Sequence, residues 1–278
     1  MLRWLLSALA GVGFLTSVAH AQDEKPRHFS QCQAIAGNLP GATFARFDPN
    51  ADSIKLQPAA TADEPVTITY LGHSTFHIQT PGGVTIATDY NGWYKPAAPP
   101  MVATMNHAHT THYTLTPDPG IQYVLHGWSD VPEEAIKHEL VVGDTFIRNV
   151  TTDIRRWGTF EKNGNSIFIF EVAGLCIGHL GHLHHELAEG HYAEIGRLDV
   201  LMVPVDGGLT MGKQSMSKVV QRLRSSVILP MHRRGPVIDD FLDMFGPEYD
   251  VVSSPEDRIQ VSLRSLPKKP TIYILKGL

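Results

Sequence analysis

The chain has 278 residues, of which 42% are hydrophobic and 18% charged, which is enough for one large domain or two small ones with a sizeable core. Acidic residues (28) outnumber basic ones (23), and the net charge of −5 gives no support for nucleic acid as a partner. The unusual feature is a content of 15 histidines, most of which lie in the middle of the chain.

Residues 1–21 have the pattern of a signal peptide. Arg3 precedes an apolar run, and Ala19-His20-Ala21 forms a small-residue cleavage site before Gln22. The alternative is an uncleaved membrane anchor, but the run is shorter than the roughly 20 residues that a span needs. No other segment is apolar enough to span a membrane. The sequence therefore predicts a periplasmic or secreted protein.

Residues 22–64 are rich in Pro, Ala, Asp and Gln and show little periodicity, so we expect an extension that packs on a domain. Cys32 lies in this extension, and Cys176 lies in an apolar run typical of a strand. The two could pair in an oxidising compartment. The alternative, which the apolar surroundings of Cys176 favour, is a buried free thiol at this position.

The segment from residue 66 alternates in the manner of strands. Residues 66–80 are predicted to form one strand, which Pro81-Gly82-Gly83 joins to a second at 84–89. Further strands are expected at 101–106, 122–127, 138–150 and 165–181, the last broken at Ala173-Gly174.

The later part of the chain alternates strands with helices. Helices are expected at 185–196, 213–226 and 236–246, and strands at 197–208, 227–232, 258–263 and 271–278. No change of composition separates the two parts. We therefore expect one α/β domain over residues 65–278, with two sheets sandwiched between helices.

Histidines follow three of the predicted strands. The segment "HAHTTH" places His107, His109 and His112 after the strand at 101–106, and "GHLGHLHH" places His179, His182, His184 and His185 after another. A single histidine, His232, ends the strand "VILPM". Because sites in α/β folds gather at the carboxyl ends of strands, three such clusters together indicate a metal site.

These segments resemble the metallo-β-lactamase superfamily over about residues 65–265. The similarity is greatest to the branch of metal-dependent hydrolases that includes ascorbate-phosphate lactonase-like proteins and the phospholipase D acting on N-acyl ethanolamines. "YLGHSTFHIQTPGGVTIATD" resembles the opening hairpin of that branch, "HAHTTH" its H-x-H-x-D-H signature, and "VILPMH" the strand with its last histidine ligand. The resemblance implies an αββα four-layer sandwich and metal ligands at His107, His109, His112 and His232.

The departures from the family pattern concern its carboxylates. Thr111 stands where the signature has Asp, and His182 stands where the family has its metal-bridging Asp. No histidine occurs near residues 149–158, where the family has another ligand; Asp153 and Thr152 are the nearest candidates. Two divalent ions about 3.5 Å apart repel by roughly 19 kcal/mol at an effective dielectric of 20, and neutral imidazoles do not offset that. We therefore expect about one ion.

Zinc suits a tetrahedral set such as His107, His109, His182 and His232, although iron or manganese would also be compatible with the family. The implied function is metal-dependent hydrolysis of an ester, lactone, amide or phosphoester in a small molecule. The candidate catalytic residues are His182, as fourth ligand or general base, and Asp206. The alternative is a non-catalytic relative that binds metal or a small ligand, which the altered carboxylates support.

Other residues receive supporting roles in this interpretation. Asp89 and Asp206 could each hold a histidine in one tautomer, or cap the loop that follows. Arg233 and Arg234 could bind an anionic group of a substrate, or lie in a solvated loop. We expect His73 and His77 to lie in the core or behind the ligands, and His184 and His185 to lie at the surface or behind the ligands. The sequence predicts no oligomeric state.

Overall fold

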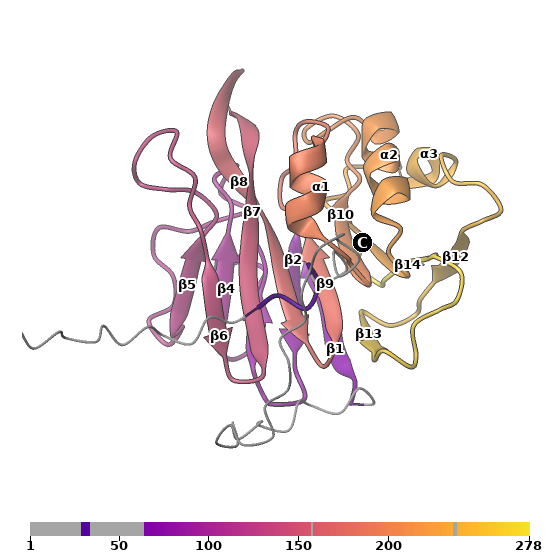
Figure 1. The fold of residues 1–278 in the computed structure, drawn as a ribbon, viewed down its shortest axis with the longest axis horizontal. Coiled ribbons are helices and arrows are strands. Elements are labelled where there is room, and N and C mark those ends of the chain that lie inside the picture. Colours follow the sequence, from indigo (N-terminus) through magenta and orange to yellow (C-terminus); the bar gives the residue numbers. More distant parts are fainter. Residues whose placement is uncertain (1–28, 34–63, 157, 236–237) are drawn as a thin grey trace, which may run out of the picture.

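The structure is a computed structural model, and it describes residues 29–33, 64–156, 158–235 and 238–278. Two sheets lie face to face (Figure 1). Sheet A contains, in spatial order, β13 (Arg258–Val261), β1 (Val66–Gly72), β2 (Thr75–Gln79), β3 (Thr85–Ala87), β4 (Val102–Met105) and β5 (Tyr123–His126). Sheet B contains β12 (Asp250–Ser253), β14 (Thr271–Ile274), β11 (Val227–Met231), β10 (Val200–Pro204), β9 (Leu175–His179), β8 (Thr159–Val172), β7 (Thr145–Arg156) and β6 (Glu139–Val142).

The main core lies between the sheets. Alternate residues of the strands point inward, so that Ile68 and Ile78 of sheet A meet Phe168, Phe170 and Met202 of sheet B in one buried cluster. The predicted two-sheet sandwich is confirmed by this arrangement. Strands β9, β10, β11 and β14 pair in parallel, as do β3, β4 and β5, so the loops after several of these strands meet at one end of the molecule.

The two outer faces are covered differently. Helices α1 (Glu189–Ile195), α2 (Lys213–Leu223) and α3 (Ile238–Leu242) place Ile195, Val219 and Phe241 in a second buried cluster on the outer face of sheet B (Figure 1). The outer face of sheet A, which carries Ala103 and Met105, is covered within the described residues by side chains from loops. These loops contain the runs "NGWYKPAAPP" and "TPDPG", whose prolines and glycines do not favour a helix.

Most predicted elements of the chain occur near their expected positions, but two segments predicted as single strands were predicted wrongly. Residues 138–150 turn at Gly143 and Asp144, between β6 and β7, which pair in antiparallel fashion. The other is the segment 66–80. It forms two strands, β1 and β2, which pair with each other in antiparallel fashion. The chain turns at Gly72 and His73, both of which have positive φ, 126° and 53°. His73 therefore lies in a turn between two strands and not within one strand.

The free thiol predicted at Cys176 is also wrong, because Cys32 and Cys176 form a disulfide with a Cα–Cα distance of 5.9 Å. Residues 29–33 are held against the domain by one buried carboxylate. Glu171 accepts hydrogen bonds from the Ser30 hydroxyl (2.5 Å) and from the backbone N–H of Gln31 (2.8 Å). This alignment brings Cys32 over the start of β9.

Glu171 is in turn paired with Arg148, whose Nε donates to it over 2.7 Å in a buried site. The other nitrogens of Arg148 donate to the carbonyl oxygens of Glu194 and Ile195 at the end of α1. The predicted signal peptide and most of the predicted extension lie outside the described residues. None of the helices that the structure describes is long and apolar enough to cross a membrane.

Candidate metal centre

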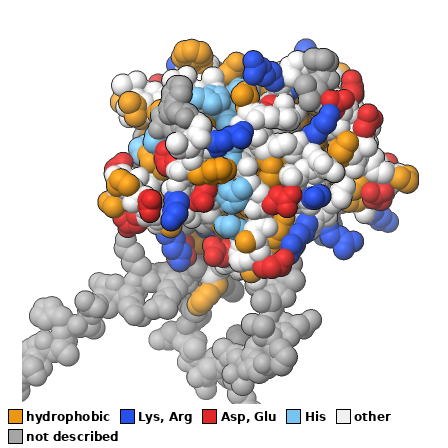
Figure 2. Space-filling model, turned by 90° about the horizontal axis from the view of Figure 1, so that it is seen from above, with side chains coloured by type: hydrophobic (Ala, Val, Ile, Leu, Met, Phe, Trp, Pro, Cys, Tyr) orange, Lys and Arg blue, Asp and Glu red, His pale blue; other side chains and the backbone are white. Residues whose placement is uncertain are grey.

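Four histidines from three separate parts of the chain converge at one end of the sandwich. They are His73 in the β1–β2 turn, His109 and His112 in the loop after β4, and His232 directly after β11. Each offers a ring nitrogen that lies within 4.8 Å of one from every other member. Seen from above, histidine side chains lie along the middle of this face of the molecule (Figure 2). We call His73, His109, His112 and His232 the four-histidine group.

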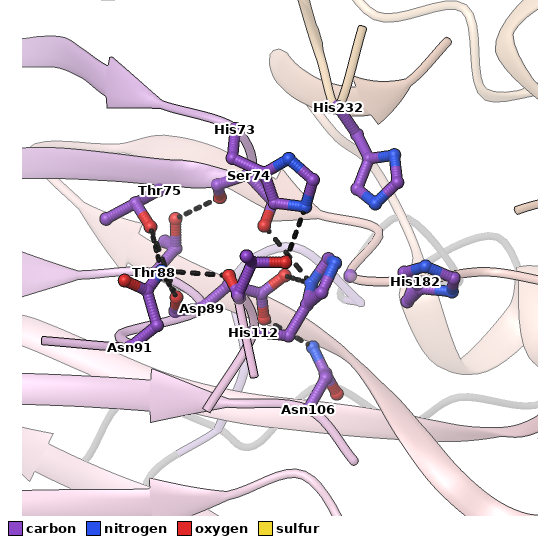
Figure 3. Close-up of polar contacts among 12 residues, drawn as sticks. His73, Ser74, Thr75, Thr88, Asp89, Asn91, Asn106, His112, His182 and His232 are labelled. Atoms are coloured by element: carbon purple, nitrogen blue, oxygen red, sulfur yellow. Dashed lines mark hydrogen bonds and ion pairs between the residues drawn. The ribbon is translucent and has the colours of Figure 1, made fainter. Parts of the chain in front are cut away.

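A fifth imidazole faces the same space. His182, in the loop after β9, has its ring centroid 4.6 Å from that of His112, 4.9 Å from that of His232 and 5.0 Å from that of His109. Its side chain points towards the space between the His112 and His232 rings (Figure 3). His182 thus lies beside the four-histidine group, as the sequence predicted for a ligand or a general base.

Several of these rings have nitrogens that find no partner. His112 Nε2 and both ring nitrogens of His182 and His232 are buried and make no hydrogen bond within the described part of the chain. Leaving buried polar atoms unpaired is costly, and native structures do it rarely. A cation in the space between the rings would satisfy several of them at once.

The protonation states suit such a cation. Burial lowers the pKa of His112 and of His182 well below the usual histidine value, and the neighbouring histidines lower both further. Burial, followed by the proximity of His232 and His109, lowers the pKa of His73 to about 4. At neutral pH these imidazoles are therefore uncharged, and a neutral imidazole has the lone pair that a metal ion requires.

A buried carboxylate sets the orientation of His112. Its Nδ1 donates to Asp89 Oδ2 over 2.6 Å, and the second oxygen of Asp89 accepts from Asn106 Nδ2 over 2.9 Å (Figure 3). Because Nδ1 carries the proton, the lone pair of His112 is on Nε2, the atom that faces the other histidines. Such carboxylate–histidine pairs support metal ligands in many proteins. Asp89 thus occupies the supporting position that the sequence suggested for it.

Asp206 has a similar position behind His232, whose Nδ1 lies 3.2 Å from Asp206 Oδ1, although not in hydrogen-bonding geometry. Asp206 also accepts hydrogen bonds from the Thr210 hydroxyl and from the backbone N–H groups of Gly208 and Leu209. Burial alone would raise the pKa of Asp206, but His232 and Thr210 more than compensate and hold it below its usual value. Asp206 is therefore an ionised carboxylate that lies against His232 and fixes the loop that follows it.

Thr111 joins two members of the group. Its hydroxyl lies 2.8 Å from His73 Nε2 and 2.8 Å from His109 Nδ1. One hydroxyl has a single proton, so it donates to one ring and accepts from the other. The Thr111 carbonyl accepts from Asn91 Nδ2 over 2.8 Å, which fixes the loop. A neutral hydroxyl therefore occupies the position at which the family signature has a negative charge.

Three residues of the site have strained backbone conformations. His73, Asp89 and His232 have φ values of 53°, 43° and 55°, which non-glycine residues adopt infrequently. The backbone N–H of His232 donates to the carbonyl of His73 over 2.6 Å, which ties the end of β11 to the β1–β2 turn. Such conformations persist where the surrounding structure enforces them, and they cluster at functional sites.

The structure does not bring His107 into the four-histidine group. Its Nδ1 lies 2.6 Å from Glu161 Oε1, and its ring stacks on that of Trp128 with centroids 4.9 Å apart. His107 and His109 are two residues apart, but they face different cavities. The prediction that His107 belongs to the group of ligands is therefore not supported by the geometry. His73, which we expected in the core or behind the ligands, lies in the four-histidine group instead.

The remaining candidates lie around the site. His184 and His185 accept the backbone N–H groups of Arg155 (3.1 Å) and Asp153 (3.0 Å), and so connect the β9–β10 loop to strand β7. Asp153 accepts from the backbone of Asn163 and is not part of the four-histidine group. Arg233 and Arg234, the predicted anion-binding residues, are exposed after His232, and neither lines the cavity beside the site.

Comparison with known proteins agrees with this geometry. The profile of a family described as a beta-lactamase superfamily domain matches residues 67–232, more than half of the chain. The chain belongs to the metallo-β-lactamase superfamily. A UPF0173 metal-dependent hydrolase from Pyrococcus furiosus is 24% identical over 189 residues, which cover 60% of this chain and 84% of that protein.

Solved structures show the same fold. A protein from Thermotoga maritima, described as a candidate zinc-dependent hydrolase of this superfamily, is 28% identical and superposes with a TM-score of 0.52 over 76% of this chain and 98% of its own. The metallo-β-lactamase fold protein YhfI from Bacillus subtilis has the same TM-score over 78% of this chain and 98% of its own at 10% identity, which shows the fold alone. Together with the unpaired nitrogens and the carboxylates behind His112 and His232, this membership makes the four-histidine group a fitting site for a metal ion.

Proposed function

We propose that the protein is an exported metal-dependent hydrolase that acts on a small molecule through a single metal ion held by the four-histidine group. The observation that carries the proposal is the convergence of four imidazoles, two of them backed by buried carboxylates, on a space that leaves buried nitrogens unpaired. The names of the relatives from Pyrococcus furiosus and Thermotoga maritima support it.

A divalent ion bound here would make a water molecule more acidic and polarise the carbonyl or phosphoryl oxygen of a substrate. An all-imidazole ligand set favours zinc over manganese, which prefers oxygen ligands. His182 is neutral and buried, with both ring nitrogens unpaired, so it has a lone pair that can accept the proton of an attacking water molecule. Asp89 holds the ring of His112 by a hydrogen bond, and Asp206 places a negative charge beside the ring of His232.

The disulfide supports the proposal that the protein is exported. Cys32 and Cys176 are joined in the structure, and disulfides persist mainly in oxidising compartments such as the periplasm and the extracellular space. The signal-peptide pattern of residues 1–21 points to the same destination.

The proposed function is tested by a hydrolysis screen of the purified full chain with ester, lactone, amide and phosphodiester substrates. We expect one of these classes to be hydrolysed, the activity to disappear after treatment with a chelator, and a stoichiometric amount of zinc to restore it. Activity that persists in the metal-depleted protein would contradict the proposal.

A non-catalytic metal- or ligand-binding protein is the second candidate, and the neutral Thr111 hydroxyl between His73 and His109 is the observation that favours it. The family's carboxylate at this position is absent, and with it the charge that would orient a nucleophile. A protein that binds metal tightly and hydrolyses none of the substrates in the screen would support this second function.

The metal content should be about one divalent ion per chain. The four-histidine group and His182 contribute no negative charge, so they do not offset the repulsion of roughly 19 kcal/mol between two ions about 3.5 Å apart. Elemental analysis of the purified protein after dialysis measures this ratio. Two tightly bound ions per chain would contradict the electrostatic argument.

Replacing His182 by alanine should separate catalysis from metal binding. Because His182 lies beside the four-histidine group but is not a member of it, we expect His182→Ala to retain about one ion per chain. Loss of a general base should lower kcat by roughly 10²–10⁴-fold. Elemental analysis and steady-state kinetics on the same preparation measure both quantities. If His182→Ala instead loses the ion, His182 is a ligand.

A further inference from the structure

A cavity of about 610 Å³ opens beside the metal centre. His109 and His182 form one side of it, and Arg155 and Leu209 line it as well. The other described residues that line it are Ala108 and two glycines, which add little side-chain bulk. A volume of this order is typical of small-molecule sites. The cavity therefore provides room for a substrate in contact with the imidazoles of the site.

The charge and polarity of this cavity are unequally distributed. Arg155 contributes a guanidinium group, whereas no carboxylate side chain lines the cavity among the residues that the structure describes. Leu209 contributes an apolar side chain that is 45% exposed although it lies next to the site. Basic and hydrophobic side chains also lie next to the histidines when this face is viewed from above (Figure 2). One face of the cavity thus suits an anion and another suits an apolar group.

His184 links the strand that carries Arg155 to the loop that carries Leu209. Its Nδ1 accepts the backbone N–H of Arg155 over 3.1 Å, and its Nε2 donates to the carbonyl of Leu209 over 2.7 Å. Arg155 Nη2 also donates to the carbonyl of Gly208 over 3.2 Å. The loop that carries Leu209 is held from the other side by Asp206. The guanidinium and the leucine therefore occupy a defined position before any ligand binds, which lowers the entropy lost on binding.

A second cavity allows an internal comparison. It has a volume of about 520 Å³ and lies on the other side of the "HAH" segment, where His107 contributes to its wall. Its lining includes the carboxylates of Asp130, Glu133, Glu134 and Glu161, with Lys162 as the one basic partner among the lining residues. Two cavities of similar size therefore flank the segment that carries His109. An anionic molecule is repelled from the acidic one and attracted to the one that touches the metal centre.

We propose that the cavity beside His109 and His182 binds the substrate as an amphiphilic monoanion, with the negative group on Arg155 and an apolar part against Leu209. This proposal rests on the proposed hydrolase function, because only a hydrolase would have this molecule as its substrate. The binding itself needs no turnover and can be measured without it. The sequence suggested Arg233 and Arg234 as the residues that bind a negative group, and the proposal assigns this role to Arg155 instead. The scissile bond of such a molecule lies between its two ends, next to His109 and His182.

The test compares two probes of nearly the same shape, 4-phenylbutyrate and its neutral amide, by isothermal titration calorimetry on the metal-loaded full chain. We expect the carboxylate to bind more tightly than the amide. In Arg155→Gln the affinity for the carboxylate should fall by about tenfold or more, because a hydrogen bond to a charged group is lost, and the affinity for the amide should change little. In Leu209→Asn both affinities should fall.

Two further arginine variants make the outcome decisive. Arg258→Gln removes an exposed arginine on β13 in sheet A, outside both cavities, and should leave the preference for the carboxylate unchanged. Arg233→Gln tests the expectation from the sequence. If the preference persists in Arg155→Gln, the anion is bound by the metal ion or elsewhere, and the proposal is overturned. A loss of the preference in Arg233→Gln alone overturns it as well. Failure to hydrolyse any substrate, with the probe results as expected, would count against the proposed function and not against the cavity.

Discussion

Replacing His112 by alanine should abolish metal binding and hydrolysis together. His112 is completely buried, its Nε2 has no partner within the described residues, and its Nδ1 is held by Asp89, so the substitution removes the ligand atom that the fold holds most firmly in place. Loss of a residue behind a ligand lowers metal affinity or activity by roughly 10–100-fold. We expect that loss from Asp89→Asn and a larger one from His112→Ala, measured by competition with a chelator of known affinity.

The controls for this experiment test whether the ligands are those that the structure brings together or those that the family signature predicts. His77→Gln changes a histidine on β2 outside the four-histidine group, and it should retain the ion. His107→Ala is the informative comparison, because the family signature predicts it as a ligand and the structure places it against Trp128 and Glu161. If His107→Ala loses the ion while His112→Ala retains it, the assignment to the four-histidine group is wrong.

Replacing Cys32 by serine should lower the free energy of unfolding by about 2–5 kcal/mol. The disulfide joins residues 144 positions apart and connects the N-terminal segment to β9. Removing it releases a long loop in the unfolded chain and frees the segment that covers Glu171 and Arg148. Denaturant unfolding of the mature chain under non-reducing conditions measures the change.

The matched control for the disulfide is the unchanged chain in reducing agent. We expect its unfolding curve to move to that of Cys32→Ser, whereas the curve of the variant should not respond to reducing agent. Two free thiols in the protein secreted by a producing cell would show that the pair does not form, and they would weaken the argument for an oxidising compartment.

Periodicity and turn residues carried enough information to predict the two-sheet sandwich. The apolar runs of β10 and β11 are only five residues long, which favours buried strands over helices, and the amphipathic pattern of α2 indicates a helix. Histidines at strand ends predicted the end of the molecule at which His109, His112 and His232 come together, because the parallel strands bring those ends to one place. Local pattern and elementary topology were sufficient for both conclusions.

The membership of the site was harder to predict, and His73 shows why. The alternation of residues 66–80 continues smoothly through the turn, so the pattern conceals the reversal at Gly72 and His73. The Gly72-His73-Ser74 sequence was the available signal, since glycine within a strand pattern often marks a break. His107 shows the converse problem. Its orientation depends on Trp128 and Glu161, which are distant in sequence and whose contacts no spacing rule contains.

The positions of the ligands have a consequence for how the protein matures. His73 belongs to the first hairpin of sheet A and His232 follows β11 of sheet B, so an ion held by both would clamp the two sheets together at one end. No half of the chain contains the complete set, so tight capture of the ion must await the folding of nearly the whole domain. Its binding energy would then add to the stability of the folded state. In a chain that folds without metal, we expect local stability to be lowest at the end of the sandwich that carries the four-histidine group.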